Sequence, residues 1–275
     1  MPSSRLTPCL LLPLLTVLSG CISHPPATSS NALARPASDT QDGAIPAPRS
    51  GAPIRATSPA TAGTPARAAS PAPRTDCRKA KCIALTFDDG PGPLTSGILD
   101  ALEARKAHAT FFVLGPRAQA HPAIIRRARE LGMEIGNHSW THADLARMGQ
   151  ATATRELTRT SNAIRRASGQ GPFSVRPPYG SFVQATPHTG LPFVLWDVDT
   201  EDWKNHSSAV TTQRALAGAH PGAIILMHDI HPSTARALPD LVKALQGRGY
   251  TLVTVPELLG PMSAKKAYYS STVRR

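Results

Sequence analysis

The sequence has no apolar run long enough to cross a membrane as a helix. Its N-terminal apolar stretch, residues 6–18, is shorter than the ~20 residues that such a helix needs. One positive charge, Arg5, precedes the stretch, and small residues follow it. This is the pattern of a secretory signal peptide, so we predict that residues 1–20 are removed on export.

Large apolar and aromatic residues are almost missing from residues 22–75, which are rich in Ala, Pro, Ser and Thr. Such a composition buries too little surface to offset the entropy lost on folding. We therefore predict that residues 21–75 form a disordered tether and that the folded part begins near residue 76.

Cysteine is scarce, and one of the four cysteines, Cys21, ends the tetrapeptide Leu18-Ser-Gly-Cys21. This tetrapeptide resembles the lipobox of bacterial lipoproteins, which implies acylation of Cys21. The alternative is an ordinary secretory signal with a chance cysteine. Ile22, in place of Asp, resembles the pattern of outer-membrane sorting in Gram-negative cells. We expect a lipoprotein of the cell envelope, held in the outer membrane and facing the periplasm.

Cys9 lies in the predicted signal peptide, which leaves only the pair Cys77 and Cys82. A zinc ribbon would need a second pair, so the sequence argues against one. In an exported protein a single C-x4-C pair predicts a disulfide, and two free thiols are the alternative.

Acidic residues are fewer than basic ones, 18 against 30, but the basic excess lies near the ends. Residues 22–81 carry 8 basic and 3 acidic side chains, and the predicted basic tail, residues 263–275, carries 4 and none. Residues 82–262 are nearly balanced, with 17 against 15. This distribution argues against a nucleic-acid partner and suits attraction to anionic envelope polymers or lipid head groups.

Residues 76–262 have the length of one domain, in which strand-like runs alternate with helix-like segments. The predicted strands are residues 82–87, 110–114, 133–136, 173–176, 192–198, 223–227 and 251–255. The predicted helices are residues 95–106, 122–131, 151–168, 207–217 and 233–246. This alternation predicts an α/β fold with a parallel sheet, most simply a closed or nearly closed barrel.

Polar clusters follow five of the predicted strands. They are Asp88-Asp89, His138-x-x-x-His142, Arg176-Pro-Pro-Tyr-Gly180, Asp199-Thr-Glu-Asp-Trp203 and His228-Asp229. All strand ends of a parallel barrel open on one face, so we expect the five clusters to converge there.

Two of these clusters suggest a metal site. The spacing of His138 and His142 predicts that both imidazoles lie on one side of a helical turn, where they can chelate one metal. One carboxylate completes a two-His, one-Asp set, for which zinc is suitable in the envelope. Asp88 and Asp89 point to opposite faces of a strand unless the backbone bends, so we predict one ligand and one base.

The other clusters suggest acid-base chemistry. Arg176 is expected to pair with one of the two acids, and an acid such as Asp202 is expected to keep His228 protonated as a general acid. Trp203, together with Trp196, is a candidate wall for a sugar ring, with core packing as the alternative.

Taken in order, these motifs resemble those of the polysaccharide deacetylases, the NodB-homology domains of carbohydrate esterase family 4. The motifs are Thr86-Phe-Asp-Asp-Gly-Pro91, His138-Ser-Trp-Thr-His142, Arg176-Pro-Pro-Tyr-Gly180, Asp199-Thr-Glu-Asp-Trp203 and Leu226-Met-His228. The resemblance covers about residues 78–260 and implies a distorted (β/α)7 barrel. It also implies metal-dependent removal of acetyl groups from a polysaccharide.

The resemblance further implies a role for each matching residue. Asp89, His138 and His142 would hold the metal, zinc or another divalent transition metal such as cobalt. Asp88 would be the base and Arg176 would orient it. The Tyr179 backbone N–H would stabilise the oxyanion, and His228, tuned by Asp202, would protonate the leaving amine. Trp203 and Leu226 would line the acetyl pocket.

One departure from the family concerns residues 181–189, which are short and contain Pro187 where the family usually carries a full helix. We expect a monomeric hydrolase that removes N-acetyl groups from N-acetylglucosamine in a glycan, and peptidoglycan is the favoured substrate. Chitin-type oligomers, exopolysaccharide and acetylated xylan are the alternatives. An iron oxygenase and a non-enzymatic glycan-binding lipoprotein are rival classes.

Overall fold

The computed structural model describes residues 75–271 of the 275-residue chain. The predicted signal peptide, the predicted lipidation site Cys21 and the predicted tether up to residue 74 lie outside the described residues. So does the end of the predicted basic tail, residues 272–275.

The central element is β1, a strand that is buried along its whole length except at its first residue. A continuous apolar run of this kind is typical of a parallel strand that is covered on both faces. The strands are β1 Lys81–Asp88, β2 Ala109–Val113, β3 Glu134–Asn137, β4 Phe193–Val194, β5 Val198–Asp199, β6 Ile224–His228, β7 Tyr250–Leu252 and β8 Ala267–Tyr268. All of their pairings are parallel, in the order β3-β2-β1-β6-β5, with β7 beside the start of β1.

A single residue, Val175, extends the sheet beyond β3. It bridges Asn137 on one side and Phe193 on the other, and β4 in turn pairs with β8. The strands therefore curve round from β5 to β4. Residues 195–197 connect these two strands in the chain, and no ladder joins the two within the described part. The predicted parallel α/β fold is confirmed, in the form of an irregular barrel whose fourth strand is reduced to one bridging residue.

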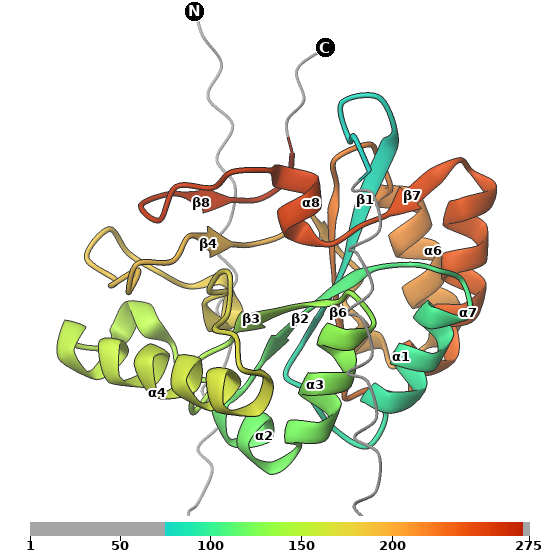
Figure 1. Cartoon of the computed structure of the whole chain (residues 1–275). Helices are drawn as coiled ribbons and strands as arrows, with labels where there is room; N and C mark the ends of the chain where they lie inside the picture. The colour runs from blue at the N-terminus through green and yellow to red at the C-terminus, as the bar shows by residue number, and fades with distance from the viewer. Residues whose placement is uncertain (1–74, 272–275) are drawn as a thin grey trace, which may run out of the picture. The chain divides into compact units, whose positions relative to one another are not determined.

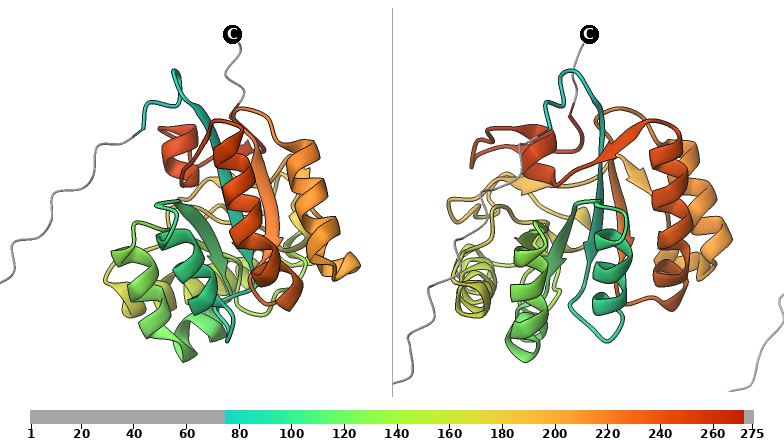
Figure 2. Two further views of the ribbon diagram at one scale, coloured as in Figure 1. Left: turned by 90° about the vertical axis from the view of Figure 1, so that its right-hand side faces the viewer. Right: turned by 45° about the vertical axis from the view of Figure 1, so that its right-hand side comes forward.

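Helices cover the outer face of the sheet (Figures 1 and 2). They are α1 Thr95–Glu103, α2 Gly115–Ala120, α3 Pro122–Glu130, α4 Gln150–Ser168, α5 Asp202–Asn205, α6 Ser208–Gly218, α7 Pro232–Gly247 and α8 Val255–Leu259. α7 packs against α1 and α6, and α4 packs against α2 and α3. No helix in the described range combines the length and the apolar character that a bilayer span requires.

The alternation of buried apolar and exposed charged side chains along α4 explains why it forms a helix on the surface of the barrel. Leu157 and Ile164, seven residues apart, are both buried on one face, while charged side chains occupy the other. The helix ends at Gly169, whose φ of 77° is the left-handed conformation that a glycine cap supplies.

Several elements differ from the sequence prediction. The predicted strand 173–176 contributes only the bridge at Val175, and the predicted strand 192–198 is split into β4 and β5. α2, α5 and α8 were not predicted, because each has six residues or fewer and shows no resolvable helical period. The fold also continues beyond residue 262, because β8 pairs with β4 inside the predicted basic tail.

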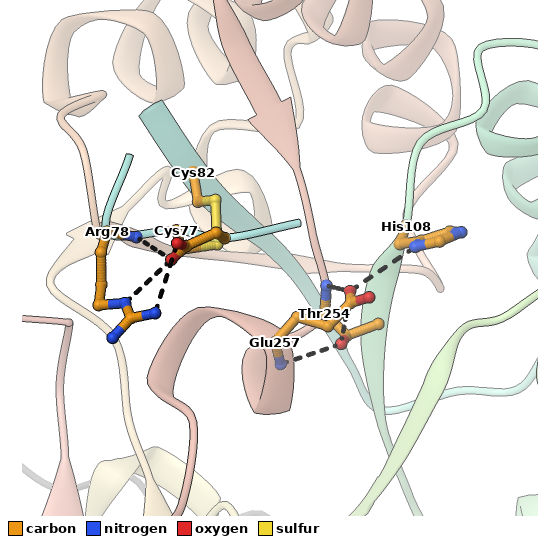
Figure 3. The surroundings of a disulfide bond; sticks show 7 residues. Cys77, Arg78, Cys82, His108, Thr254 and Glu257 are labelled. Carbon is orange, nitrogen blue, oxygen red and sulfur yellow. Dashed lines mark hydrogen bonds and ion pairs between the residues drawn. A yellow bond between two sulfur atoms is a disulfide. The ribbon is translucent and has the colours of Figure 1, made fainter. Parts of the chain in front are cut away.

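At the start of β1, Cys77 and Cys82 form the predicted disulfide, with Cα atoms 5.4 Å apart (Figure 3). The same figure shows how α8 begins. The Thr254 side chain and the Glu257 side chain form a reciprocal capping box, and Glu257 Oε2 lies 3.6 Å from His108 Nδ1. These contacts stabilise the end of the barrel opposite to the carboxyl end of β1.

Candidate active site

The five polar clusters meet at the carboxyl ends of the strands. Asp88 is the last residue of β1 and His228 the last of β6, and the ladder places the two directly side by side. The clusters surround a cavity of about 380 Å³. Its lining residues are Asp88, Asp89, His138, His142, Tyr179, Trp196, Asp199, Trp203, Leu226 and His228. Residues up to 140 positions apart in the chain are therefore brought to one site by parallel strand pairing.

Asp89, His138 and His142 form a group that could hold a metal, with one ligand atom from each lying within 4.8 Å of the others. Asp89 Oδ1 is 3.5 Å from His138 Nε2 and 3.3 Å from His142 Nε2. The same oxygen is buried and has no hydrogen-bond partner in the structure. A buried carboxylate oxygen without a donor fits a cation, and this donor set suits a divalent transition metal.

The backbone around these ligands differs from the prediction. The two imidazoles were expected on a helical turn, but residues 138–142 form a loop in which Ser139 (φ 67°) and His142 (φ 58°) are left-handed. The prediction of a helical turn at these residues was therefore wrong. Asp89 is left-handed too (φ 74°), and this bend turns its side chain into the same cavity as that of Asp88.

Hydrogen bonds on the far side of each imidazole orient the two histidines. His138 Nδ1 donates to the Arg176 carbonyl at 2.8 Å, so its Nε2 is left as an acceptor that faces the carboxylates. Burial lowers the pKa of His138 to about 3 and keeps it neutral, as a metal ligand must be. His142 Nδ1 lies 3.2 Å from the Tyr179 hydroxyl, which fixes that ring in the same way.

Arg176 is fully buried and holds Asp88. Its Nη1 donates to Asp88 Oδ1 and to Thr86 Oγ1, both at 2.8 Å, and its remaining N–H groups donate to the carbonyls of Val194 and Leu195 at 3.0 and 2.9 Å. Burial raises the pKa of Asp88, and the guanidinium opposes that shift. The predicted pairing of Arg176 with one of the two acids is thus present in the structure, and the partner is Asp88.

On the other side of the cavity, His228 is held by Asp202, the first residue of α5. His228 Nδ1 donates to Asp202 Oδ1 at 2.8 Å, and the His228 backbone N–H donates to Oδ2 at 2.7 Å. Burial alone would lower the pKa of His228, but the hydrogen bond and charge of Asp202 raise it to about 9. Burial likewise opposes ionisation of Asp202, yet its bonds from His228 and Thr234 keep the pKa of that carboxyl below its ordinary value. The result is a protonated imidazole at neutral pH.

The remaining predicted site residues line the opening and the floor. Tyr179 is left-handed (φ 61°) and its ring is largely exposed, and Trp203 is half exposed. Leu226, on β6, is buried beneath them. Residues 181–189, where the family's helix was missing, contain no helix, and Phe182 and His188 pack on Phe193 instead.

Three residues at the site were not assigned from the sequence. Asp199 lines the cavity, and Thr86 accepts a hydrogen bond from Arg176. Asp229 is buried against the turn after Asp89. It accepts a hydrogen bond from Thr95 at 2.5 Å, and a Cβ at Gly90 would overlap its carboxylate. All three lie within or beside the motifs, but their residue types alone did not distinguish them from ordinary strand and turn positions.

The comparisons with known proteins agree with this geometry. A family model described as polysaccharide deacetylase matches residues 75–189. A peptidoglycan-N-acetylglucosamine deacetylase of Listeria monocytogenes is 41% identical over 198 residues, which cover 71% of this chain and 42% of that protein. A chitooligosaccharide deacetylase of Bradyrhizobium is 37% identical over 203 residues, which cover 66% of this chain and 93% of that protein. The match therefore spans about two fifths of the longer relative and nearly all of the shorter one.

Solved structures resemble the chain over the same region. A structure described as T48 deacetylase with substrate has a TM-score of 0.69 and 44% identity, and the match covers 70% of this chain and 99% of that one. The fold and the site thus define the class of protein, a parallel α/β barrel whose strand ends carry three residues that could hold a metal. The chain belongs to the polysaccharide deacetylase family.

Proposed function

We propose that this protein is a metal-dependent hydrolase that removes N-acetyl groups from N-acetylglucosamine in a polysaccharide, and that the polysaccharide is peptidoglycan. The observation that carries the proposal is the pairing across the β1–β6 ladder. Asp88, held by Arg176, lies beside His228, held by Asp202, at the edge of a three-ligand metal group. Amide hydrolysis needs both a base for water and an acid for the departing amine.

The metal would be held by Asp89, His138 and His142, and we propose zinc. Two neutral imidazoles and one carboxylate with open positions are the donor set of a catalytic zinc site, and cobalt accepts the same set. A divalent cation bound there supplies Lewis acidity toward a water molecule and the acetyl carbonyl.

The chain's own residues would carry the proton transfers. Asp88, oriented by Arg176, whose charge favours the ionised carboxylate, accepts a proton from the attacking water. The Tyr179 backbone N–H donates to the oxyanion of the tetrahedral intermediate. His228, protonated because of Asp202, then gives a proton to the amine as the C–N bond breaks.

The shape of the cavity suits an acetyl group on a sugar. Leu226 on the floor and Trp203 at the rim, both in the cavity lining, give the methyl group an apolar environment. Because the site opens on exposed aromatic side chains, a sugar of a long polymer can reach it without entering the barrel.

Peptidoglycan is favoured because the Listeria monocytogenes relative is named for it and because the sequence predicts an envelope protein. The alternative is a chitin-type oligomer, as the name of the Bradyrhizobium relative indicates for that protein. Exopolysaccharide and acetylated xylan are further alternatives.

The test is acetate release by the zinc-loaded full chain from a panel of these four acetylated glycans. We expect release from peptidoglycan, and a rate at least 10²-fold lower for Asp88→Asn, which removes the base but leaves the metal ligands. Asp89→Asn should lose zinc itself, measured by elemental analysis. Asp240→Asn, an exposed carboxylate on α7, is the matched control. If Asp88→Asn loses zinc while Asp89→Asn keeps it, the two roles are reversed. If no glycan releases acetate, the hydrolase proposal fails.

We also propose that Cys21, outside the described residues, is acylated and anchors residues 76–262, the catalytic domain, through the tether of residues 21–75. Cys21→Ser should move the protein from the membrane fraction to the soluble fraction. Unchanged fractionation of that variant would remove the lipid anchor from the proposal.

A further inference from the structure

The loop that carries both histidines of the metal group is held from outside by one side chain of α4. Glu156 Oε2 accepts a hydrogen bond from the Trp140 backbone N–H at 3.0 Å and from the Thr141 backbone N–H at 2.7 Å. It also accepts one from the Thr141 hydroxyl, at 2.9 Å. One carboxylate oxygen thus satisfies three donors in the middle of the loop, between His138 and His142.

The loop needs such support because its backbone is strained. Ser139 and His142 both have positive φ and neither is a glycine. Residues held in this region persist only where their surroundings determine their conformation. Inside the loop, only the His142 N–H to Ser139 Oγ bond, at 3.1 Å, ties the two left-handed residues together. The carboxylate of Glu156 is the acceptor outside the loop that fixes Trp140 and Thr141, which lie between the two left-handed residues.

Other contacts fix α4 itself against this segment, so that Glu156 has a firm base. Asn137 Nδ2 donates to the Leu157 carbonyl at 2.7 Å, and the guanidinium of Arg159 lies 3.6 Å above the Trp140 ring. These contacts do not involve the Glu156 side chain. Removing that side chain should therefore leave the helix docked while it frees the loop.

We infer that Glu156 is a positioning residue that sets the metal-binding loop in its ligating conformation before the metal arrives. The inference rests on the proposed metal site and deepens it. Glu156 acts on the ligands through its hydrogen bonds with Trp140 and Thr141, so its effect is expected on metal affinity and not on the proton transfers at Asp88 or His228.

The first experiment measures zinc affinity by competition with a chromophoric chelator for the wild type, Glu156→Ala and Glu156→Gln. Loss of a residue that orients metal ligands typically weakens affinity 10- to 100-fold, which is the expected effect for Glu156→Ala. Glu156→Gln keeps one oxygen acceptor in the same shape and should fall between alanine and the wild type. Glu130→Gln, an exposed glutamate on α3, is the control and should bind zinc normally.

A second measurement needs no metal. Amide hydrogen exchange at Trp140 and Thr141 in the metal-free protein should be faster in Glu156→Gln than in the wild type, while exchange in β1 is unchanged. A residue that only stabilises the fold would instead speed exchange throughout the barrel and leave zinc affinity intact once the protein is folded. Wild-type zinc affinity in folded Glu156→Gln and Glu156→Ala would overturn the inference.

These outcomes separate the inference from the proposed function. If the wild type binds zinc with the Glu156 dependence described but releases no acetate, the inference stands and the hydrolase proposal fails. If acetate release by Glu156→Gln stays low at saturating zinc, Glu156 acts on the chemistry and the positioning role is wrong.

Discussion

Asp202→Asn is the substitution that tests most directly how the acid of this site is made. The Asp202 carboxylate accepts hydrogen bonds from His228 Nδ1 at 2.8 Å, from the His228 backbone N–H at 2.7 Å and from the Thr234 hydroxyl at 2.6 Å. Asparagine has the same shape but no charge, and one of its two positions is a donor. The variant therefore keeps the packing at α5 while it removes the anion that holds the proton on His228.

The magnitude follows from the pKa of His228, which is about 9 against an ordinary value of 6.5. Without Asp202, burial lowers the pKa of the imidazole and only the charges of Asp88 and Asp89 still raise it, so His228 should titrate near its ordinary value of 6.5. At pH 8 the protonated fraction would fall from about 90% to about 3%, which is a ~30-fold loss of active acid. At pH 6 both proteins would be mostly protonated, so the variant should recover to within about twofold from this cause.

The assay is acetate release by the zinc-loaded wild type and variant between pH 6 and 9, expressed as the ratio of the two rates at each pH. The ratio cancels every group that titrates equally in both proteins. A direct check is the proton NMR titration of the His228 ring, with Asp240→Asn as the control variant. A rate ratio that does not change with pH, or an unchanged His228 titration, would refute the electrostatic role of Asp202.

Two further predictions concern the stability of the barrel. Glu257 has a pKa lowered to about 2, first by its pairing with His108 and then by hydrogen bonds from Thr254. The ionised side chain therefore stabilises the fold fully at a pH above 4.5, its ordinary pKa. That contribution is lost as the pH falls toward 2, and the difference in urea midpoint between the wild type and Glu257→Gln should shrink over this range. A constant difference would show that the ionised form contributes nothing. The double substitution Cys77→Ser, Cys82→Ser should lower the free energy of unfolding by about 2 kcal/mol, because the unfolded chain regains the entropy that the short disulfide loop removes. Equal urea midpoints for the wild type, with and without reductant, and for the double variant would contradict this.

The sequence predicted much of the site because the chemistry lies where strands end. Asp88, Arg176 and His228 each follow an apolar or β-favouring run, and parallel pairing alone is enough to bring such residues together. To predict that these residues converge, only the correct fold class was needed, and the alternation of strand-like and helix-like segments indicated that class.

What the sequence could not predict depends on backbone conformation and on single long-range contacts. The spacing of His138 and His142 is equally compatible with a helical turn and with a loop, and only the left-handed Ser139 and His142 decide for the loop. Glu156 was missed for a related reason. A glutamate in the middle of an amphipathic helix is usually a solvated residue, and nothing local shows that its oxygen meets Trp140 and Thr141.

The arrangement of the strands also explains how Asp88 and His228 can carry opposite charges although they lie side by side. Asp88 is buried and His228 is partly buried, and burial pushes both toward their neutral forms, which would leave the site with neither a charged base nor a charged acid. The fold counters this with one oppositely charged partner for each. Arg176 comes from beyond the β3 edge and Asp202 from beyond the β5 edge, so the two partners approach β1 and β6 from opposite sides. Because neither partner lies in the same strand as the group it controls, the charge state of the site depends on the closure of the barrel as much as on the two residues that would transfer protons.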